Sequence, residues 1–191
     1  NNHGSHNFLI VGKTGSYAKK RSLVRFDLGA VPDGTAVQDA TLRVYYYKAT
    51  KPTGVIEPSL DRVIQVHRVL VSWVENQANI TYRSSGTAWG TSYVGIDNVD
   101  AEANPLSSDT WSPGVYGWKT FDVTSAAQAW HANSSTNHGV LFWATNETSN
   151  GRDMRFYSSE QSNTSLRPVL EVNWACTTSE GDSPTQPGKG N

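Results

Sequence analysis

The feature that most constrains the fold is an alternation of apolar and polar side chains with a period of two. It is clearest in residues 40–47, ATLRVYYY, where every second residue from Ala40 to Tyr46 falls on one side of an extended strand. Similar short runs, separated by turns rich in Gly, Pro and Asn, occur at residues 8–11, 22–28, 63–73, 118–123, 139–144, 154–159 and 168–174. Many short strands of this kind predict an all-β fold, an antiparallel β-sandwich.

One segment follows a helical period instead. Residues 122–135 are rich in Ala, and Thr124 is placed to cap the N-terminus of a helix. One stripe of that helix carries Val123, Ala126, Ala127 and Trp130. We predict a single short helix near residues 125–132 that closes one end of the sandwich with Trp130.

The apolar faces of these elements define the predicted core. Phe26 is representative, because truncation of an enclosed aromatic ring to Ala is expected to cost about 3 to 5 kcal/mol. The predicted core residues are Val24, Phe26, Leu28, Leu42, Val44, Phe121, Val123, Trp130, Leu141, Leu170 and Val172.

The length of 191 residues suits one domain with a tail. We place the domain at residues 1–176 and interpret residues 177–191, rich in Ser, Thr, Pro and Gly, as a flexible tail or linker. Charged residues make up 17% of the chain and the net charge is -1, which does not favour a nucleic-acid partner. No run reaches the ~18 apolar residues of a membrane span. The single cysteine, Cys176, excludes an internal disulfide.

Several ordered blocks of the sequence carry a family resemblance. They are LIVG, RSLVRFDLGAVPDGTAVQDATLRVY, IQVHRVLVSWVE, WKTFDVTSAAQAW, NHGVLFW and RFYSSEQSNTSLRPVLEVNW, and they cover roughly residues 8 to 174. In this order they resemble the DNRLRE domains, also described as disaggregatase-related domains or carbohydrate-binding module family 96. The resemblance implies a secreted or cell-surface β-sandwich of jelly-roll type. Such domains are commonly appended to polysaccharide-degrading enzymes, and some bind acidic glycans such as alginate.

Aromatic side chains on the solvent side of a strand mark the first candidate binding surface. Tyr45 and Tyr47 fall on the face opposite to the core, roughly 7 Å apart, and Arg43 continues their row. A flat ring covers the C–H face of a sugar, while a guanidinium reaches hydroxyls or a carboxylate. A second interpretation stays open, in which the tyrosines pair across neighbouring strands only to stabilise the sheet.

The second candidate surface lies in the long, weakly patterned stretch at residues 82–117. Loops of this length in a compact domain are usually functional or wrap the surface. Basic and aromatic character is added further along the chain by Arg155 and Tyr157. The candidate residues in or beside the long stretch are Trp89, Trp111, Trp118 and Lys119.

Nothing in the sequence has the pattern of a catalytic site, so we predict no enzyme activity and no required cofactor. The acidic cluster of Asp97, Asp100 and Glu102 shares one loop without an anchoring pattern. Two interpretations of this cluster stay open, a solvated acidic loop and a structural Ca²⁺ site built from hard oxygen ligands. His67 is predicted to lie at the surface or at an edge. Four sequons would be glycosylated only in a secretory lineage, at Asn79, Asn133, Asn146 and Asn163.

Two functions compete for this sequence. The first is a non-catalytic extracellular carbohydrate-binding module whose partner is an acidic polysaccharide. The second is a structural subunit of an extracellular filament or surface layer, assembled by strand addition between copies. Family members usually carry an extended segment ahead of the element at which this chain begins, so we expect an unpaired sheet edge at the N-terminus. Such an edge would accept a strand from another copy.

Overall fold

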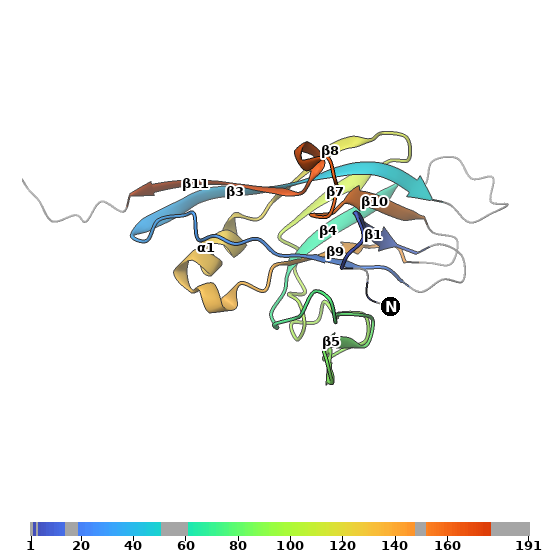
Figure 1. Cartoon of the computed structure of the whole chain (residues 1–191), viewed down its shortest axis with the longest axis horizontal. Helices are drawn as coiled ribbons and strands as arrows, with labels where there is room; N and C mark the ends of the chain where they lie inside the picture. Colours follow the sequence, from blue (N-terminus) through green and yellow to red (C-terminus); the bar gives the residue numbers. More distant parts are fainter. Residues whose placement is uncertain (1, 3, 14–18, 51–60, 148–151, 177–191) are drawn as a thin grey trace, which may run out of the picture.

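Two antiparallel sheets pack face to face in the computed structural model of the chain (Figure 1). The structure describes residues 2, 4–13, 19–50, 61–147 and 152–176, and the predicted tail at 177–191 lies outside the described residues. The larger sheet contains β1 (Phe8–Gly12), β10 (Asp153–Tyr157), β3 (Thr35–Thr50), β8 (Gly117–Asp122) and β11 (Val169–Cys176). The smaller sheet contains β2 (Ser22–Val24), β9 (Val140–Ala144), β4 (Arg62–Arg68) and β7 (Ser107–Trp111).

The strand order is that of a jelly roll. In the larger sheet β1, β10, β3 and β8 follow one another, and in the smaller sheet the order is β2, β9, β4 and β7. Arg43 of β3 pairs with Val169 of β11 on one side and with Thr120 of β8 on the other. Strand β11 therefore lies on the same side of β3 as β10, beside residues 35–43. The predicted all-β sandwich of jelly-roll type is confirmed.

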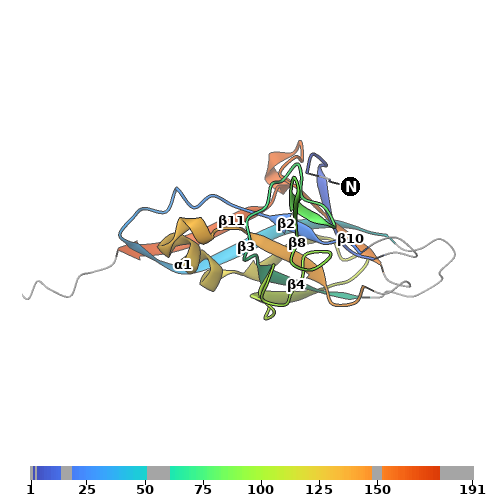
Figure 2. The same cartoon turned by 90° about the horizontal axis from the view of Figure 1, so that it is seen from below.

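The short helix is confirmed as α1 (Thr124–Ala132), which lies against β3 (Figure 2). Its N-terminus differs from the prediction, because Thr124 is the first helical residue and not the cap. The Thr124 hydroxyl accepts the backbone N–H of Ala40 at 3.0 Å, while Asp122 Oδ1 accepts the N–H of Thr124 at 2.9 Å. Two 3₁₀ turns follow along the chain, η1 (Ser134–Thr136) and η2 (Thr164–Leu166). No helix in the described part is long and apolar enough to cross a membrane.

The main core lies between the two sheets. Six of the predicted core residues are buried: Leu42, Val44, Phe121, Val123, Trp130 and Leu141. Five others pack against the core and are partly buried: Val24, Phe26, Leu28, Leu170 and Val172. Val24 ends the three-residue strand β2, and Phe26 and Leu28 follow it. Leu170 and Val172 belong to β11, which pairs with β3 alone. Both groups lie at the rim of the sandwich.

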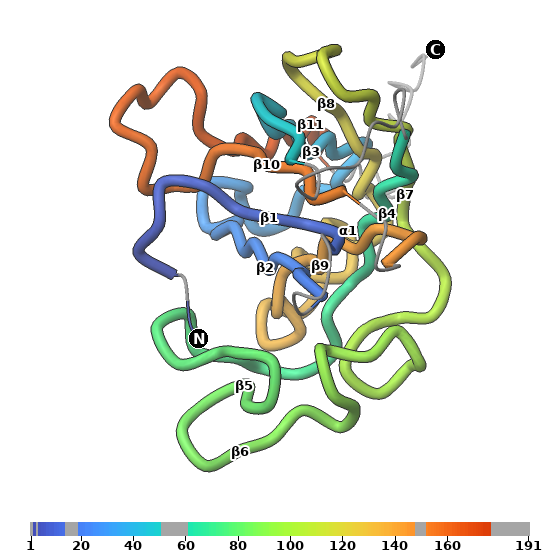
Figure 3. The backbone as a smooth tube through the Cα atoms, turned by 90° about the vertical axis from the view of Figure 1, so that its right-hand side faces the viewer, coloured from blue at the N-terminus to red at the C-terminus, as the bar shows by residue number. Residues whose placement is uncertain are grey.

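A second apolar cluster covers the outer side of the smaller sheet. Residues 69–103 fold over this side as a cap that contains the hairpin β5 (Tyr82–Ser84) and β6 (Thr87–Ala88), green in Figure 3. Strand β9 is consequently buried on both faces, with Phe142 in the main core and Leu141 under the cap. The stretch 82–117 is therefore not one long loop, because it also contains strand β7 with the polar sequence SSDTW.

His67 is buried and not at the surface, because the cap lies over its strand, β4. Its side chain is 0% exposed, and its Nδ1 lies 2.8 Å from the backbone carbonyl of Glu102. Burial lowers the pKa of His67 below its ordinary value of 6.5, although the bond to the Glu102 carbonyl opposes this shift. The imidazole is therefore neutral in the folded protein at pH 7.

Replacement of a core ring should cost far more stability than replacement of a rim ring. Phe142→Ala is expected to lower the free energy of unfolding by about 3 to 5 kcal/mol, because the ring is enclosed between Phe121 and Phe156. Phe26→Ala, the same change at a partly exposed ring, is expected to cost clearly less. Chemical denaturation of both variants tests this, and equal losses would contradict the assignment of core and rim.

His67 should make stability depend on pH just below neutrality. The unfolded state binds a proton near the ordinary pKa of ~6.5, whereas the folded state resists protonation, so acid favours the unfolded state. Stability is expected to fall as the pH drops from 7 through 6, and His67→Gln is expected to flatten this slope. Part of the pH dependence that remains in this variant comes from His138, because burial also lowers the pKa of His138. Denaturation midpoints at several pH values provide the measurement, and an unchanged slope in the variant would contradict the prediction.

Candidate functional site

Strand β3 directs the three consecutive tyrosines to opposite faces. Tyr46 is fully buried in the core, whereas Tyr45 and Tyr47 are partly exposed on the outward face, as the alternation predicts. A β-bulge follows, because the register with β10 skips one residue between Tyr46 and Lys48. The bulge leaves Lys48 exposed as well, which alternation alone does not predict.

Four rings from three adjacent strands form one aromatic row on this outward face. The aromatic row consists of Trp118 on β8, Tyr45 and Tyr47 on β3, and Tyr157 on β10. Trp118 meets Tyr45 edge-on with 5.4 Å between ring centroids, and Tyr157 stacks on Tyr45 at 5.9 Å and on Tyr47 at 4.3 Å. All four rings are partly exposed, so the row combines mutual support with open ring surface.

A guanidinium group lies at each end of the aromatic row. The Arg43 guanidinium lies 4.8 Å from the ring centroid of Trp118 and pairs with Glu171 at 2.6 Å. At the other end, burial raises the pKa of Tyr47 above its ordinary value, and Arg155 opposes this by its charge and a hydrogen bond. The phenol of Tyr47 therefore stays protonated at neutral pH and keeps its donor.

Three residues of the second candidate surface are not available on this face. Trp111 is 0% exposed and stacks on Tyr46 inside the core, with 4.9 Å between ring centroids. Trp89 is 6% exposed and packs inside the cap. Lys119 lies opposite Val44 in the register, so it points away from the aromatic row and contacts Asp109 at 3.5 Å. The structure thus corrects the expectation that these side chains lie on an open surface with Trp118, which alone joins the row.

The acidic cluster does not assemble a metal site. Asp100 is buried and accepts hydrogen bonds from the backbone N–H groups of Gly90, Thr91 and Gly95. Glu102 pairs with Arg68. Within the described ranges, no group of three His, Cys, Asp or Glu residues could hold a metal ion. The Asp97 carboxylate accepts the N–H of Val99 in its own loop. These carboxylates hold the cap together and leave no convergent oxygen set for Ca²⁺.

None of the four sequon asparagines belongs to a strand of the aromatic row. Asn133 and Asn163 are exposed and cap η1 and η2, where each side-chain oxygen accepts a backbone N–H two residues ahead. Asn79 is partly buried in the cap, where its amide donates to Gln77, and Asn146 is exposed after β9.

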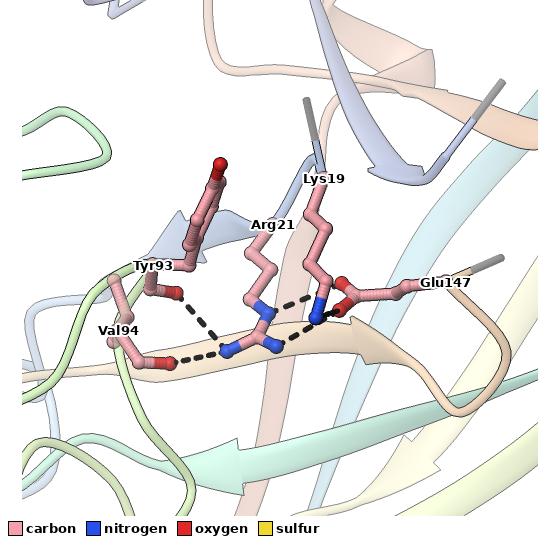
Figure 4. Close-up of polar contacts among 5 residues, drawn as sticks. All are labelled: Lys19, Arg21, Tyr93, Val94 and Glu147. Carbon is pink, nitrogen blue, oxygen red and sulfur yellow. Dashed lines mark hydrogen bonds and ion pairs between the residues drawn. The ribbon is translucent and has the colours of Figure 1, made fainter. Parts of the chain in front are cut away.

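The cap is fixed to the sandwich by a buried ion pair (Figure 4). Arg21 binds Glu147 through two hydrogen bonds of 3.1 and 2.9 Å and donates to the carbonyls of Tyr93 and Val94. Tyr93 and Val94 both have positive φ, 71° and 61°, which is costly for a β-branched residue such as Val94. The guanidinium thus holds a strained turn of the cap against the sheet. The outer face of the smaller sheet is thereby covered, whereas the rings on the outward face of the larger sheet stay partly exposed among the described residues.

Comparison with sequence models of known families identifies the family of this chain. The sequence model of a family described as the disaggregatase related repeat domain matches residues 2–172, nearly the whole described part of the chain. None of the curated proteins searched matches the chain. The resemblance seen in the ordered sequence blocks is therefore confirmed.

The buried ion pair of the cap should matter much more than the exposed one beside the aromatic row. Glu147→Gln leaves the largely buried charge of Arg21 without its carboxylate, and the expected loss of stability is about 3 to 5 kcal/mol. Glu171→Gln, the same change in the solvent-exposed pair with Arg43, should cost about 1 kcal/mol or less. Chemical denaturation of both variants provides the test. Similar small losses would show that Arg21 does not anchor the cap.

Proposed function

We propose that this chain, which belongs to the disaggregatase related repeat family, binds a polysaccharide on the outward face of its larger sheet. The observation that supports this is the aromatic row itself, four partly exposed rings in contact across three strands. The outer face of the smaller sheet is occupied by the cap, so the outward face of the larger sheet is the one that we propose for a long ligand.

The chemistry of the row suits a sugar chain. Each pyranose ring has C–H groups that pack on an aromatic face, and hydroxyls that bond to phenol, indole or guanidinium groups. Strands lie about 4.8 Å apart, so the row from β8 to β10 extends roughly 10 Å across the sheet, perpendicular to the strands. A linear polymer laid along this direction would meet Trp118 first, then Tyr45 and Tyr157.

The cations at the ends of the row favour an acidic polymer. In this proposal Arg43 and Arg155 pair with carboxylates of the ligand, although Arg155 also lies 3.8 Å from the Asp153 carboxylate, and Lys48 adds a third, exposed charge. Arg43 is held by Glu171, which is half-exposed, so a ligand carboxylate has to compete with a weak surface pair. The preference for an acidic polymer should therefore be electrostatic and sensitive to salt.

The proposed role is binding without catalysis, outside the cell. Hydrolysis of a glycosidic bond needs two carboxylates that face each other across the ligand. The carboxylate of Glu171 beside the aromatic row is already paired with Arg43. The domain therefore acts as a module that keeps a partner enzyme or a surface close to its polysaccharide.

Affinity electrophoresis in gels that contain alginate, pectin, xylan or cellulose tests this function. The unchanged chain is expected to be retarded most by the acidic polymers, and added salt should reduce the retardation. The double change Tyr45→Ala with Tyr157→Ala removes the centre of the aromatic row and should abolish the retardation. Tyr82→Ala serves as the control, since it removes an exposed ring from the cap, away from the row. Equal retardation of the unchanged chain and the double variant would refute the proposed surface.

A further inference from the structure

The N-terminal edge of the larger sheet, expected to be open, is closed. The hydroxyl of Ser22 accepts the backbone N–H of Ile10 at 3.1 Å and donates to the Ile10 carbonyl at 2.8 Å. Further along β1, Gly12 exchanges two backbone hydrogen bonds with Lys20. The segment that leads into β2 therefore occupies the outer edge of β1, and the expectation of strand addition at this edge is corrected.

Two other edges are also closed. The free edge of β3 is covered by three side chains of α1, because Thr124 binds the N–H of Ala40, Gln128 binds the Val37 carbonyl and His131 binds the Thr35 carbonyl. Strands β7 and β8 run beside each other at the opposite side of the sandwich, where Asp109 and Lys119 form an ion pair between them. These are devices that keep a sheet edge from pairing with another chain.

Strand β11 has no such device. Its eight residues contain neither Pro nor Lys, and their one charge, Glu171, is paired with Arg43 on the adjacent strand. The backbone N–H and C=O of Ala40 bond to Thr124 and Val123, on the side of β3 away from β11. Val172 lies opposite Ala40 in the register, so the backbone N–H and C=O of Val172 point away from β3. By alternation, Leu170 does the same. No partner for these groups occurs among the residues that the structure describes.

One side of this edge carries a row of apolar side chains, of which Leu170 and Val172 are partly buried and Trp174 is exposed. Trp174 is 45% exposed, one of the large apolar side chains that stay open to solvent. It lies opposite the buried Val37, so it shares the core side of the sheet with Leu170 and Val172. Figure 1 shows that this part of β3 and β11 forms a ribbon that extends beyond the rest of the sandwich. The ribbon thus presents an unpaired edge and an apolar row together.

We propose that β11 pairs with β11 of a second copy of this chain, antiparallel and centred on Val172. In this register the two Val172 residues face each other and exchange backbone hydrogen bonds, and Leu170 lies opposite Trp174 of the partner. On the outward side Glu171 lies opposite Asn173, so the two carboxylates do not meet directly. A register centred on Glu171 would place like charges opposite each other, which is unfavourable.

The pairing closes on itself. Because each chain uses the same edge, the contact is two-fold and produces a dimer, not a filament, which would need two different open edges in each chain. The two-fold axis of an antiparallel pair is perpendicular to the sheet, so the outward faces of both copies point in the same direction. One consequence rests on the proposed polysaccharide function. The dimer would hold two aromatic rows against one surface and bind by avidity.

Sedimentation or light scattering of the full chain, without any glycan, tests the dimer independently of polysaccharide binding. As concentration rises from micromolar towards millimolar, the apparent mass is expected to rise from 20.9 kDa towards twice that value. Val172→Pro removes an N–H that β3 does not use, and Trp174→Lys puts a charge into the apolar row; each should keep the chain monomeric. Tyr82→Lys, at an equally exposed ring on the cap, should leave the dimer unchanged.

A cross-linking experiment tests the register. In a Cys176→Ser background, Val172→Cys should form an intermolecular disulfide on oxidation, since directly opposed residues lie ~5.5 Å apart between Cα atoms. Asn173→Cys is the matched control and should not form one, because the two copies of residue 173 are offset along the strands. Circular dichroism confirms that each variant is folded. A monomer at every concentration, a dimer that survives both edge changes, or cross-linking through residue 173 would overturn the proposal.

Discussion

The structure depends on strand β3, because β8, β10 and β11 pair with it and α1 packs against it. Its 16 residues pair with β8 on one side and with β10 and β11 in succession on the other. The alternation along it puts Leu42, Val44 and Tyr46 into the core. The same geometry necessarily turns Tyr45 and Tyr47 outward, so the core and the candidate binding face are fixed by one pattern.

The outer faces of the two sheets differ in their residues and in whether the cap covers them. The smaller sheet carries Leu141 and Leu23 on its outer side, and these apolar residues need the cap. The cap in turn needs Arg21, whose contacts hold a turn with two positive φ angles against the sheet. The larger sheet carries amphipathic rings that remain stable in contact with water, so it needs no cover. An open aromatic face is thus a property of this residue choice and of its position on the uncovered sheet.

The regular parts of the strands were predictable from the sequence, whereas features set by distant contacts were not. The period of two identified the buried face of β3, and the helical stripe identified α1, because both depend on near neighbours in the chain. The exposed Lys48 was not predictable, since a bulge is decided by the partner strand. Trp111 is buried in the main core, and Trp89 and His67 are buried by the folding of the cap, so the local pattern of the sequence did not indicate their burial. The polar strand β7 was missed because SSDTW lacks the apolar alternation of the other strands.

One ion pair links the candidate binding face to the open edge. Arg43 lies against the ring of Trp118 at one end of the aromatic row, and its partner Glu171 belongs to β11. A ligand carboxylate that bonds to Arg43 displaces Glu171 or shares the guanidinium with it. In the proposed dimer Glu171 faces Asn173 of the second copy, whose amide donates one N–H to Asp39 of its own chain and has a second N–H for the released carboxylate. Dimerisation would then favour ligand binding, and by reciprocity the ligand would favour the dimer by the same factor.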